Sequence, residues 1–504
     1  MIAPPAGSRL VKEREPGQLR GALAGAAGVL VLVVLAALVA QPADLVPRLD
    51  GPIRLVTFIG GSWLAYAAGA VLVRRLPVRW AVVLIVAGGI SLPLVAGFAG
   101  GDQRGIFAGG DQRGIVAGGD QHGIFGPPRS SDDLYRYMWD GRVQAAGVDP
   151  YRYVPAAPEL VELRDDFLWP ERAHWCVSLD AVDPDAGRPL VPGCTLINRP
   201  TVHTIYPPVA EALFLAIHRL SPPDSGIVPV QLVMAAFAAA TTVLLLVGLR
   251  SARVDPRLAV LWAWCPVVAV EAGSNAHVDV VAAFLTGLAL LVLAGVRTRS
   301  ASALGGVLFG LAVASKLTPA LVAPALLRRR PIIVAVAAAG AVAAVYLPHV
   351  LSVGSAVIGY IPGYLSEEGY TEGSRFALLT LLVPQSWAGP LAVSILVAVG
   401  VWVARTADPD RPWVAATTMT GAALLIATPS YPWYSILLIL LVALGGRPEW
   451  LVVALAAQFA QYAHNLDIDP GLAQRIGYGM ALAVVVLGAL VRQRARQPTA
   501  TSRT

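Results

Sequence analysis

The sequence predicts an all-α, polytopic membrane protein with about 14 transmembrane helices and one large extracytoplasmic loop. Of its 504 residues, 56% are hydrophobic and only 14% are charged. A soluble chain of this length would carry roughly a quarter charged residues. Several apolar runs reach about 20 residues, the length of helix that crosses a bilayer. We therefore expect a multi-pass protein of the cell membrane, surrounded by the lipid bilayer.

The net charge of +6 does not indicate nucleic-acid binding. The arginines instead form short clusters between apolar runs, as membrane topology requires. The chain has three cysteines and no CxxC pair, so a zinc or redox site is not expected. Cys176 and Cys194 lie in one outer loop, where we expect a disulfide and where two unpaired thiols are the alternative. Cys265 lies within an apolar run, where we expect it to pack.

The N-terminal apolar runs set the orientation of the chain. Gly21–Ala40 follows a basic stretch and is longer than a signal-peptide core, so we expect an uncleaved helix with a cytoplasmic N-terminus. Leu55–Val73 returns inward to an arginine cluster, and Trp80–Phe98 crosses outward. The loop 99–205 therefore lies outside the cytoplasm, and the same alternation leaves the C-terminus inside.

The later apolar runs continue this alternation, with every dense arginine cluster on the cytoplasmic side. They are Ile227–Leu249, Leu258–Val270, Val280–Val296, a short pair around Lys316, Ile332–Val350, Trp387–Ala404, Val414–Ala427, Pro432–Leu444, Leu451–Ala463 and Ile476–Val491. Tyr206–Leu220 is apolar but short, so we interpret it as a re-entrant or interfacial segment.

These boundaries divide the chain into segments of different character. They are a cytoplasmic N-terminal segment (1–20), three transmembrane helices (21–98), a nonapeptide-repeat insertion (99–126), an extracytoplasmic loop with re-entrant or interfacial helices (127–226), a helix bundle with a second outer loop at 351–386 (227–491) and a cytoplasmic tail (492–504). The insertion repeats AGGDQRGIF, AGGDQRGIV and AGGDQHGIF. In a calcium-binding roll the Asp is the sixth residue of a GGxGxD unit, whereas here it directly follows the two glycines. We therefore favour a flexible insertion.

The outer loop contains an acidic stretch, SSDDLYRYMWDG, that begins a segment of helical character. Ser131 or Asp132 would cap this helix, because a side-chain oxygen there accepts hydrogen bonds from free backbone N–H groups. A cap needs one such residue, which leaves Asp133 for another role. Arg136 and Asp140 follow Asp133 along the same helix face.

Five motifs follow one another in a recognisable order: SDDLYRYMWDGRVQAAGVDPYRYVP, TIYPP, SNAHVD, ASKLTP and TPSYPWY. This order resembles bacterial members of the GT-C superfamily, which are multi-spanning glycosyltransferases that use polyprenyl-phosphate sugars. The closest likeness is to actinobacterial polyprenyl-phosphate-mannose-dependent mannosyltransferases, from about Ser130 to Trp433. The family's functional Asp lies in the first large outer loop, so Asp133 is the best match and Asp132 the next. The two extra N-terminal helices and the insertion depart from the family's simplest pattern.

The resemblance implies a GT-C-like bundle that transfers a hexose, with mannose favoured over arabinose or glucose, to an extracytoplasmic glycan or glycolipid acceptor. It also implies inversion without a metal or other cofactor, and the acidic pair has no histidine at ligand spacing. A polyprenyl-phosphate sugar has a good leaving group, so the enzyme needs a carboxylate to take the acceptor proton. It also needs cations or hydrogen-bond donors for the departing phosphate.

Candidate substrate contacts are polar or aromatic residues in or beside the outer loops. They are Arg136, Asp140, Arg199, His203, Tyr206, His277, Asp279, Lys316, Tyr431 and Trp433. Among them, Lys316, Arg136, Arg199 and His203 are candidates for the phosphate. Lys316 stands between two short apolar runs, where a buried charge is costly. The alternative is a lysine that snorkels to the membrane interface.

The remaining candidates also have structural alternatives. His277 and Asp279 at an outer helix start could line the sugar site, or form a plain cap with a satisfied histidine. Tyr431 and Trp433 could stack on the acceptor sugar, or belong to an interfacial aromatic belt. Glu367, Glu368 and Arg375 are expected on a solvated surface.

A transporter or lipid-linked-sugar flippase is the main alternative function. Transporters tend to have repeated halves with broken helices at matching positions, and this sequence has no such symmetry. A non-catalytic scaffold would leave the Asp132–Asp133 pair and Lys316 unexplained. We therefore favour the glycosyltransferase.

Overall fold

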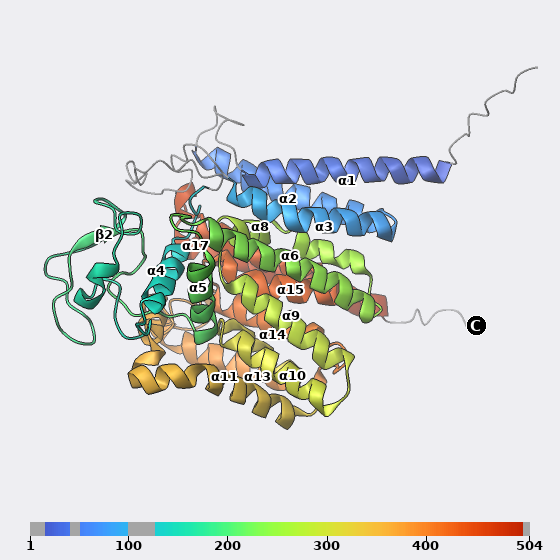
Figure 1. Cartoon of the computed structure of the whole chain (residues 1–504). Coiled ribbons are helices and arrows are strands. Elements are labelled where there is room, and N and C mark those ends of the chain that lie inside the picture. The colour runs from blue at the N-terminus through green and yellow to red at the C-terminus, as the bar shows by residue number, and fades with distance from the viewer. Residues whose placement is uncertain (1–15, 41–50, 99–125, 497–504) are drawn as a thin grey trace, which may run out of the picture.

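The computed structural model of the chain describes residues 16–40, 51–98 and 126–496. The predicted insertion lies almost wholly outside these residues, at 99–125. The described residues are helical apart from turns, loops and two strands of three residues each, which confirms the predicted α-helical class. Most long helices run side by side as a bundle (Figure 1).

Among the described residues, six helices are long and apolar enough to cross a membrane, judged by length and composition. They are α2 (Gly51–Arg75), α3 (Val78–Gly97), α6 (Val228–Ser251), α11 (Pro331–Val353) with its continuation to Glu367, α13 (Gln385–Thr406) and α17 (Pro470–Arg496). Shorter apolar stretches of helix are Ala24–Ala40 within α1 (Pro16–Ala40), α9 (Asp279–Gly295), α10 (Arg299–Val313), α14 (Pro412–Ala427) and Pro432–Gly445, which includes α15 (Ile436–Gly445). These lengths support a multi-pass membrane protein, and the total of about 14 crossings stays a prediction.

One predicted span is divided. The run Leu258–Val270 forms η3 (Pro256–Ala259), α7 (Val260–Ala263) and α8 (Pro266–Gly273). The break falls at Cys265, which is extended because it precedes Pro266. Proline lacks the N–H that would continue the helix and disfavours helical geometry in the residue before it.

The segment 126–227, between α3 and α6, folds over one end of the bundle. It contains α4 (Asp133–Ala145), η2 (Pro158–Leu163), β1 (Trp175–Val177), β2 (Gly193–Thr195) and α5 (Pro208–Leu220). Figure 1 shows α4 and α5 side by side across the direction of the long helices, with the strands beyond them. The 13 residues of α5 make a short amphipathic helix at this end of the bundle, which fits the interfacial interpretation.

Short elements complete the same end and the connections between helices. They are η4 (Thr318–Leu326), η5 (Gly354–Ile358), α12 (Ile361–Glu367), η6 (Leu379–Leu381), η7 (Pro432–Ser435), η8 (Pro448–Trp450), α16 (Leu451–Gln461) and η9 (His464–Leu466). The core lies around α15, whose residues are buried from Ile436 to Leu444. A helix that is apolar on all sides belongs inside a bundle.

Helices α3 and α8 approach so closely that Gly273 is required between them. A Cβ added at Gly273 would lie 1.9 Å from the carbonyl oxygen of Pro93. We expect Gly273→Ala to lower the free energy of unfolding by about 1–3 kcal/mol, because the backbones must separate. Gly295→Ala is the control, since a Cβ there meets nothing within 4 Å. Thermal melts in detergent measure both variants, and equal melting temperatures would contradict this packing.

Candidate active site

The start of α4 directs two carboxylates away from the helix. The hydroxyl oxygen of Ser131 accepts a hydrogen bond of 3.3 Å from the backbone N–H of Asp133. Asp132 occupies the cap position, but its side chain makes no capping hydrogen bond. Ser131 therefore supplies the local backbone contact, and both Asp132 and Asp133 keep their carboxylates for other partners.

A cavity of about 590 Å³ lies against these carboxylates. Its walls come from the segment 126–227, the turn at Lys316, α12 with the residues on either side of it, and the stretch around η7. The candidate residues that line it are Asp132, Asp133, Arg136, Arg199, His203, Tyr206, Lys316, Tyr431 and Trp433. Asp140, His277 and Asp279 are buried and lie outside this lining.

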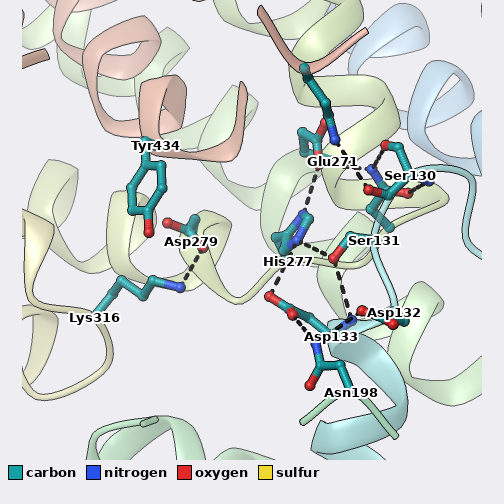
Figure 2. Close-up of polar contacts among 12 residues, drawn as sticks. Ser130, Ser131, Asp132, Asp133, Asn198, Glu271, His277, Asp279, Lys316 and Tyr434 are labelled. Carbon is teal, nitrogen blue, oxygen red and sulfur yellow. Dashed lines mark hydrogen bonds and ion pairs between the residues drawn. The ribbon is translucent and has the colours of Figure 1, made fainter. Parts of the chain in front are cut away.

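Asp133 is held by partners from two distant parts of the chain (Figure 2). The side-chain amide of Asn198 donates to one carboxylate oxygen of Asp133 over 2.6 Å. Nε2 of His277 lies 3.6 Å from the other oxygen and 3.0 Å from the hydroxyl of Ser131. Nδ1 of His277 lies 2.7 Å from the carboxylate of Glu271. The result is a row in which His277 and Glu271 are buried and Asp133 reaches the cavity.

The two acidic neighbours make His277 a cation at neutral pH. Burial alone would lower the pKa of His277, but hydrogen bonds and charges from Asp133 and Glu271 raise it to about 9. Burial would raise the pKa of Asp133, whereas His277, Lys316 and Asn198 lower it to well below its usual range. Asp133 is therefore ionised beside an imidazolium ion.

Asp132 has a different environment from its neighbour. One oxygen accepts a hydrogen bond of 2.6 Å from the indole N–H of Trp175, and the other accepts one of 2.9 Å from Asn198. Burial and the charge of Asp133 raise the pKa of Asp132 in spite of these donors. The adjacent carboxylates are thus chemically distinct, with Asp133 the more acidic.

Lys316 faces inward. Its ammonium group lies 3.2 Å from the carboxylate of Asp279 and 5.4 Å from the ring centre of Tyr206. Figure 2 shows this pair beside, and separate from, the contact between Asp133 and His277. The inward position favours a role in the cavity over the snorkelling alternative.

Arg136 lines the cavity and pairs with Asp140, which lies behind the cavity wall. The guanidinium Nε of Arg136 donates to both oxygens of Asp140, at 2.9 and 3.0 Å. Glu211, which is fully buried, accepts hydrogen bonds from Thr204 and Gln144. Burial and the charge of Asp140 raise the pKa of Glu211 well above its usual value. Among the described residues, Nη2 of Arg136 has no hydrogen-bond partner.

This buried pair predicts a large effect on stability. Arg136→Met would leave the carboxylate of Asp140 without its cation, which typically costs about 3–5 kcal/mol of unfolding free energy. The double variant Arg136→Met with Asp140→Asn removes both charges and should recover most of the loss. Unfolding titrations in mixed micelles measure both effects. Equal stability of the wild type and the single variant would contradict a buried ion pair.

The other two phosphate candidates are engaged by carboxylates. Arg199 pairs with Glu367 of α12, with 2.6 Å between Nη2 and the nearer oxygen. His203 lies 3.0 Å from Asp185. The bridge from Arg199 to Glu367 joins the segment 126–227 to α12 beside the cavity.

The aromatic candidates form a stack with the histidine. The ring of Trp433 lies 4.1 Å from that of His277 and 4.5 Å from that of Tyr431, in near-parallel geometry. Only 8% of Trp433 is exposed, so it serves mainly to pack against His277. Tyr431 is less buried and lines the cavity, where it can still contact a ligand.

Several partners in the site were not among the sequence candidates. They are Glu271, Asn198 and Trp175, none of which belongs to an acidic or cationic motif. Of the three, only Glu271 could have been found from the sequence, because it is a single carboxylate at the end of an apolar run. The expectation of a solvated surface is wrong for Glu368 and Arg375, which form an ion pair with 6% exposure on each side.

Cys176 and Cys194 form a disulfide, which is the pairing that the sequence predicts. Cys265 is free and buried, as expected for packing. Within the part of the chain that the structure describes, no group of three or more His, Cys, Asp or Glu side chains is placed to hold a metal ion.

Comparison with known proteins gives one family match. Residues 204–429 match the model of Glycosyltransferase family 87. The matched segment includes Glu271, His277 and Lys316, whereas Asp132 and Asp133 precede it. No curated protein and no solved structure matches the chain. The family match and the apolar helices together support a membrane glycosyltransferase.

Proposed function

We propose that this membrane glycosyltransferase moves a hexose, and most readily mannose, from a polyprenyl-phosphate sugar to an extracytoplasmic glycan or glycolipid. Asp133 is the general base in this proposal. The observation that carries it is the cavity in which Asp133 stays ionised next to His277, with Lys316 on the same cavity lining. The sugar and the active-site side of the membrane come from the sequence resemblance and the arginine pattern.

The proposed reaction is a single displacement with inversion. The acceptor hydroxyl oxygen attacks the anomeric carbon while its proton moves to Asp133. The bond between the anomeric carbon and the phosphate oxygen breaks, and the phosphate keeps the electron pair. Lys316, which lines the cavity, is available to stabilise that charge. No metal ion or other cofactor takes part in this scheme.

The contact with His277 affects when the proton moves. A carboxylate whose pKa lies well below the usual range is a weak base. Asp133 can therefore take the proton only late, after the bond from sugar to phosphate has largely broken and made the acceptor hydroxyl acidic. Such timing suits an oxocarbenium-like transition state, in which bond breaking leads. The negative charge of Glu271 neutralises the positive charge of His277. The negative charge of Asp133 is therefore the one that faces the acceptor.

The cavity lining combines apolar and polar residues, which suits a lipid-linked donor. Leu317 beside η4 and Leu365 on α12 line the cavity and are about half exposed, at 49% and 41%. Asn198 and Arg199 line another part, on the side of the outer loop. We place the polyprenyl chain against the leucines, with its phosphate at Lys316, and the acceptor sugar on the polar side near Tyr431.

Photoaffinity labelling tests this placement. A polyprenyl-phosphate mannose with a photoreactive group near the phosphate should label peptides within 314–318 and 358–368, in protein held in lipid nanodiscs. Excess unlabelled donor should suppress the labelling, and Lys316→Met should weaken it. Asp133→Asn is the matched control, because it changes the base and leaves the phosphate contacts. Labelling confined to other peptides would contradict the proposed donor site.

A further inference from the structure

The disulfide Cys176–Cys194 closes a small hairpin beside the acidic pair. Its strands β1 and β2 pair in antiparallel register, with Trp175 opposite Thr195 and the two cysteines opposite each other. Each strand has only three residues, and an isolated two-stranded hairpin is at best marginally stable. The disulfide is therefore a principal tie between the two arms.

Each arm of the hairpin delivers a hydrogen-bond donor to the carboxylates. Trp175 directly precedes Cys176, and its indole N–H donates to Asp132 over 2.6 Å. Asn198 follows Cys194 by four residues, and its amide nitrogen lies 2.9 Å from Asp132 and 2.6 Å from Asp133. The side-chain donors that contact Asp132 thus come from the two flanks of one disulfide.

The two arms are anchored unequally. On the second arm, the hydroxyl of Thr195 donates to the carbonyl oxygen of Leu168 over 2.6 Å and accepts from the backbone N–H of Ile197. On the first arm, Val177 packs with Leu190 in a small cluster separate from the main core. The position of Trp175 therefore depends on the disulfide more than that of Asn198 does.

We propose that the disulfide hairpin positions the acidic pair, so that Cys176–Cys194 holds Trp175 and Asn198 on Asp132 and Asp133 and sugar transfer is fast only while this bond is oxidised. Trp175 and Asn198 are positioning residues in this inference. It rests on the proposed function of Asp133.

Two adjacent carboxylates repel each other, and the hairpin donors oppose this repulsion. The side-chain amide of Asn198 donates to one oxygen of Asp132 and to one oxygen of Asp133. The indole N–H of Trp175 donates to the second oxygen of Asp132. Loss of the indole N–H would leave Asp132 with one donor fewer in a buried site, which favours its protonated form. A protonated Asp132 would compete for the oxygen of Asp133 that Asn198 now holds.

Reduction of the disulfide is a balanced two-electron exchange. The S–S bond between Cys176 and Cys194 breaks, and each sulfur takes one electron and one proton from a dithiol reductant to become a thiol. The reductant is oxidised to its own disulfide. Cys176 is exposed, so the bond is accessible to a small reductant. Cys265, the remaining cysteine, is buried and unpaired.

The first test compares oxidised and reduced protein. We expect reduction to lower kcat about tenfold, the order of effect of one lost hydrogen bond to a charged group. The KM for the donor should change little, because Lys316 is untouched, and reoxidation should restore the rate. The variant Cys176→Ser with Cys194→Ser should be as slow as the reduced protein and insensitive to reductant. A reduced wild type that transfers sugar at the oxidised rate would overturn the inference.

A second test separates positioning from general stability. Trp175→Phe keeps the ring and the disulfide but removes the donor, so kcat should fall about tenfold. The acid limb of its pH–rate profile should move to higher pH, because Asp132 protonates more readily. Trp169→Phe is the matched control, since the indole N–H of Trp169 has no hydrogen-bond partner in the described chain. Identical rates and profiles for both variants would contradict the role of Trp175.

Hydrogen–deuterium exchange tests the hairpin without any activity. Reduction should speed exchange in peptides covering 130–136 and 173–198 and leave the helices of the bundle unchanged. If no sugar donor supports transfer, the proposed function fails. The exchange rates still show whether the disulfide holds the acidic pair in position. If Asp133→Asn is inactive but reduction changes neither rate nor exchange, the function stands and the hairpin inference is overturned.

Discussion

Asp133→Asn should lower the rate of sugar transfer by about 10²-fold or more, because it removes the basic lone pair at the cavity. The substitution keeps the size of the side chain and an oxygen that can accept from Asn198. Donor binding should remain near the wild-type value, since the phosphate contacts at Lys316 are unchanged. Single-turnover transfer and donor binding, measured on the same preparation, separate the two effects.

Asp132→Asn is the neighbouring control. We expect a smaller loss, because Asp132 supports the pair through Trp175 and Asn198 and does not receive the proton. Two adjacent residues at a helix start point in different directions, so the variants should not be equivalent. If Asp133→Asn melts normally and transfers sugar at nearly the wild-type rate, the base is elsewhere.

His277→Gln should impair both transfer and folding. It leaves the carboxylate of Glu271, which is 1% exposed, without its cation, and breaking a buried ion pair typically costs about 3–5 kcal/mol of unfolding free energy. The double variant His277→Gln with Glu271→Gln removes both charges and should recover most of the stability. Its transfer rate should stay at least about tenfold below wild type, since Asp133 still lacks its partner. Unfolding titrations and transfer assays on both variants measure the two losses.

The effect of His277 on stability should depend on pH. The pKa of this histidine rises from 6.5 to about 9 on folding, so its stabilisation is fully present below 6.5 and is lost as pH rises through 9. The stability difference between wild type and the double variant should therefore shrink over that interval. A difference that is constant from pH 6 to about 10 would contradict an imidazolium ion at this position.

The local features of the fold could be predicted from the sequence because they depend on short-range patterns. The run Trp387–Ala404 lies within α13, which extends from Gln385 to Thr406. The acidic stretch begins α4 as expected. The division at Cys265 was missed because hydropathy does not register the lost N–H of one proline within an apolar run.

The candidate site was predicted in part. Asp132, Asp133 and Lys316 stood out because charge is rare in this chain. The partnership of Asp133 with His277 could not be predicted, since they are 144 positions apart in the sequence and are brought together by contacts between residues 129–133 and the turn at 275–277. The sequence left open whether His277 lines the sugar site or is a satisfied histidine at a helix start, and the structure places it behind the cavity wall, 3.6 Å from Asp133.

Sugar transfer by purified protein in liposomes tests the central claim most directly. The assay offers radiolabelled polyprenyl-phosphate mannose, arabinose and glucose, each beside the corresponding nucleotide sugar, with a glycolipid acceptor extract. We predict transfer from a polyprenyl-phosphate sugar, fastest with mannose, and none from the nucleotide sugars, with the signal lost in Asp133→Asn. Transfer from nucleotide sugars alone, or transfer that survives Asp133→Asn, would contradict the account.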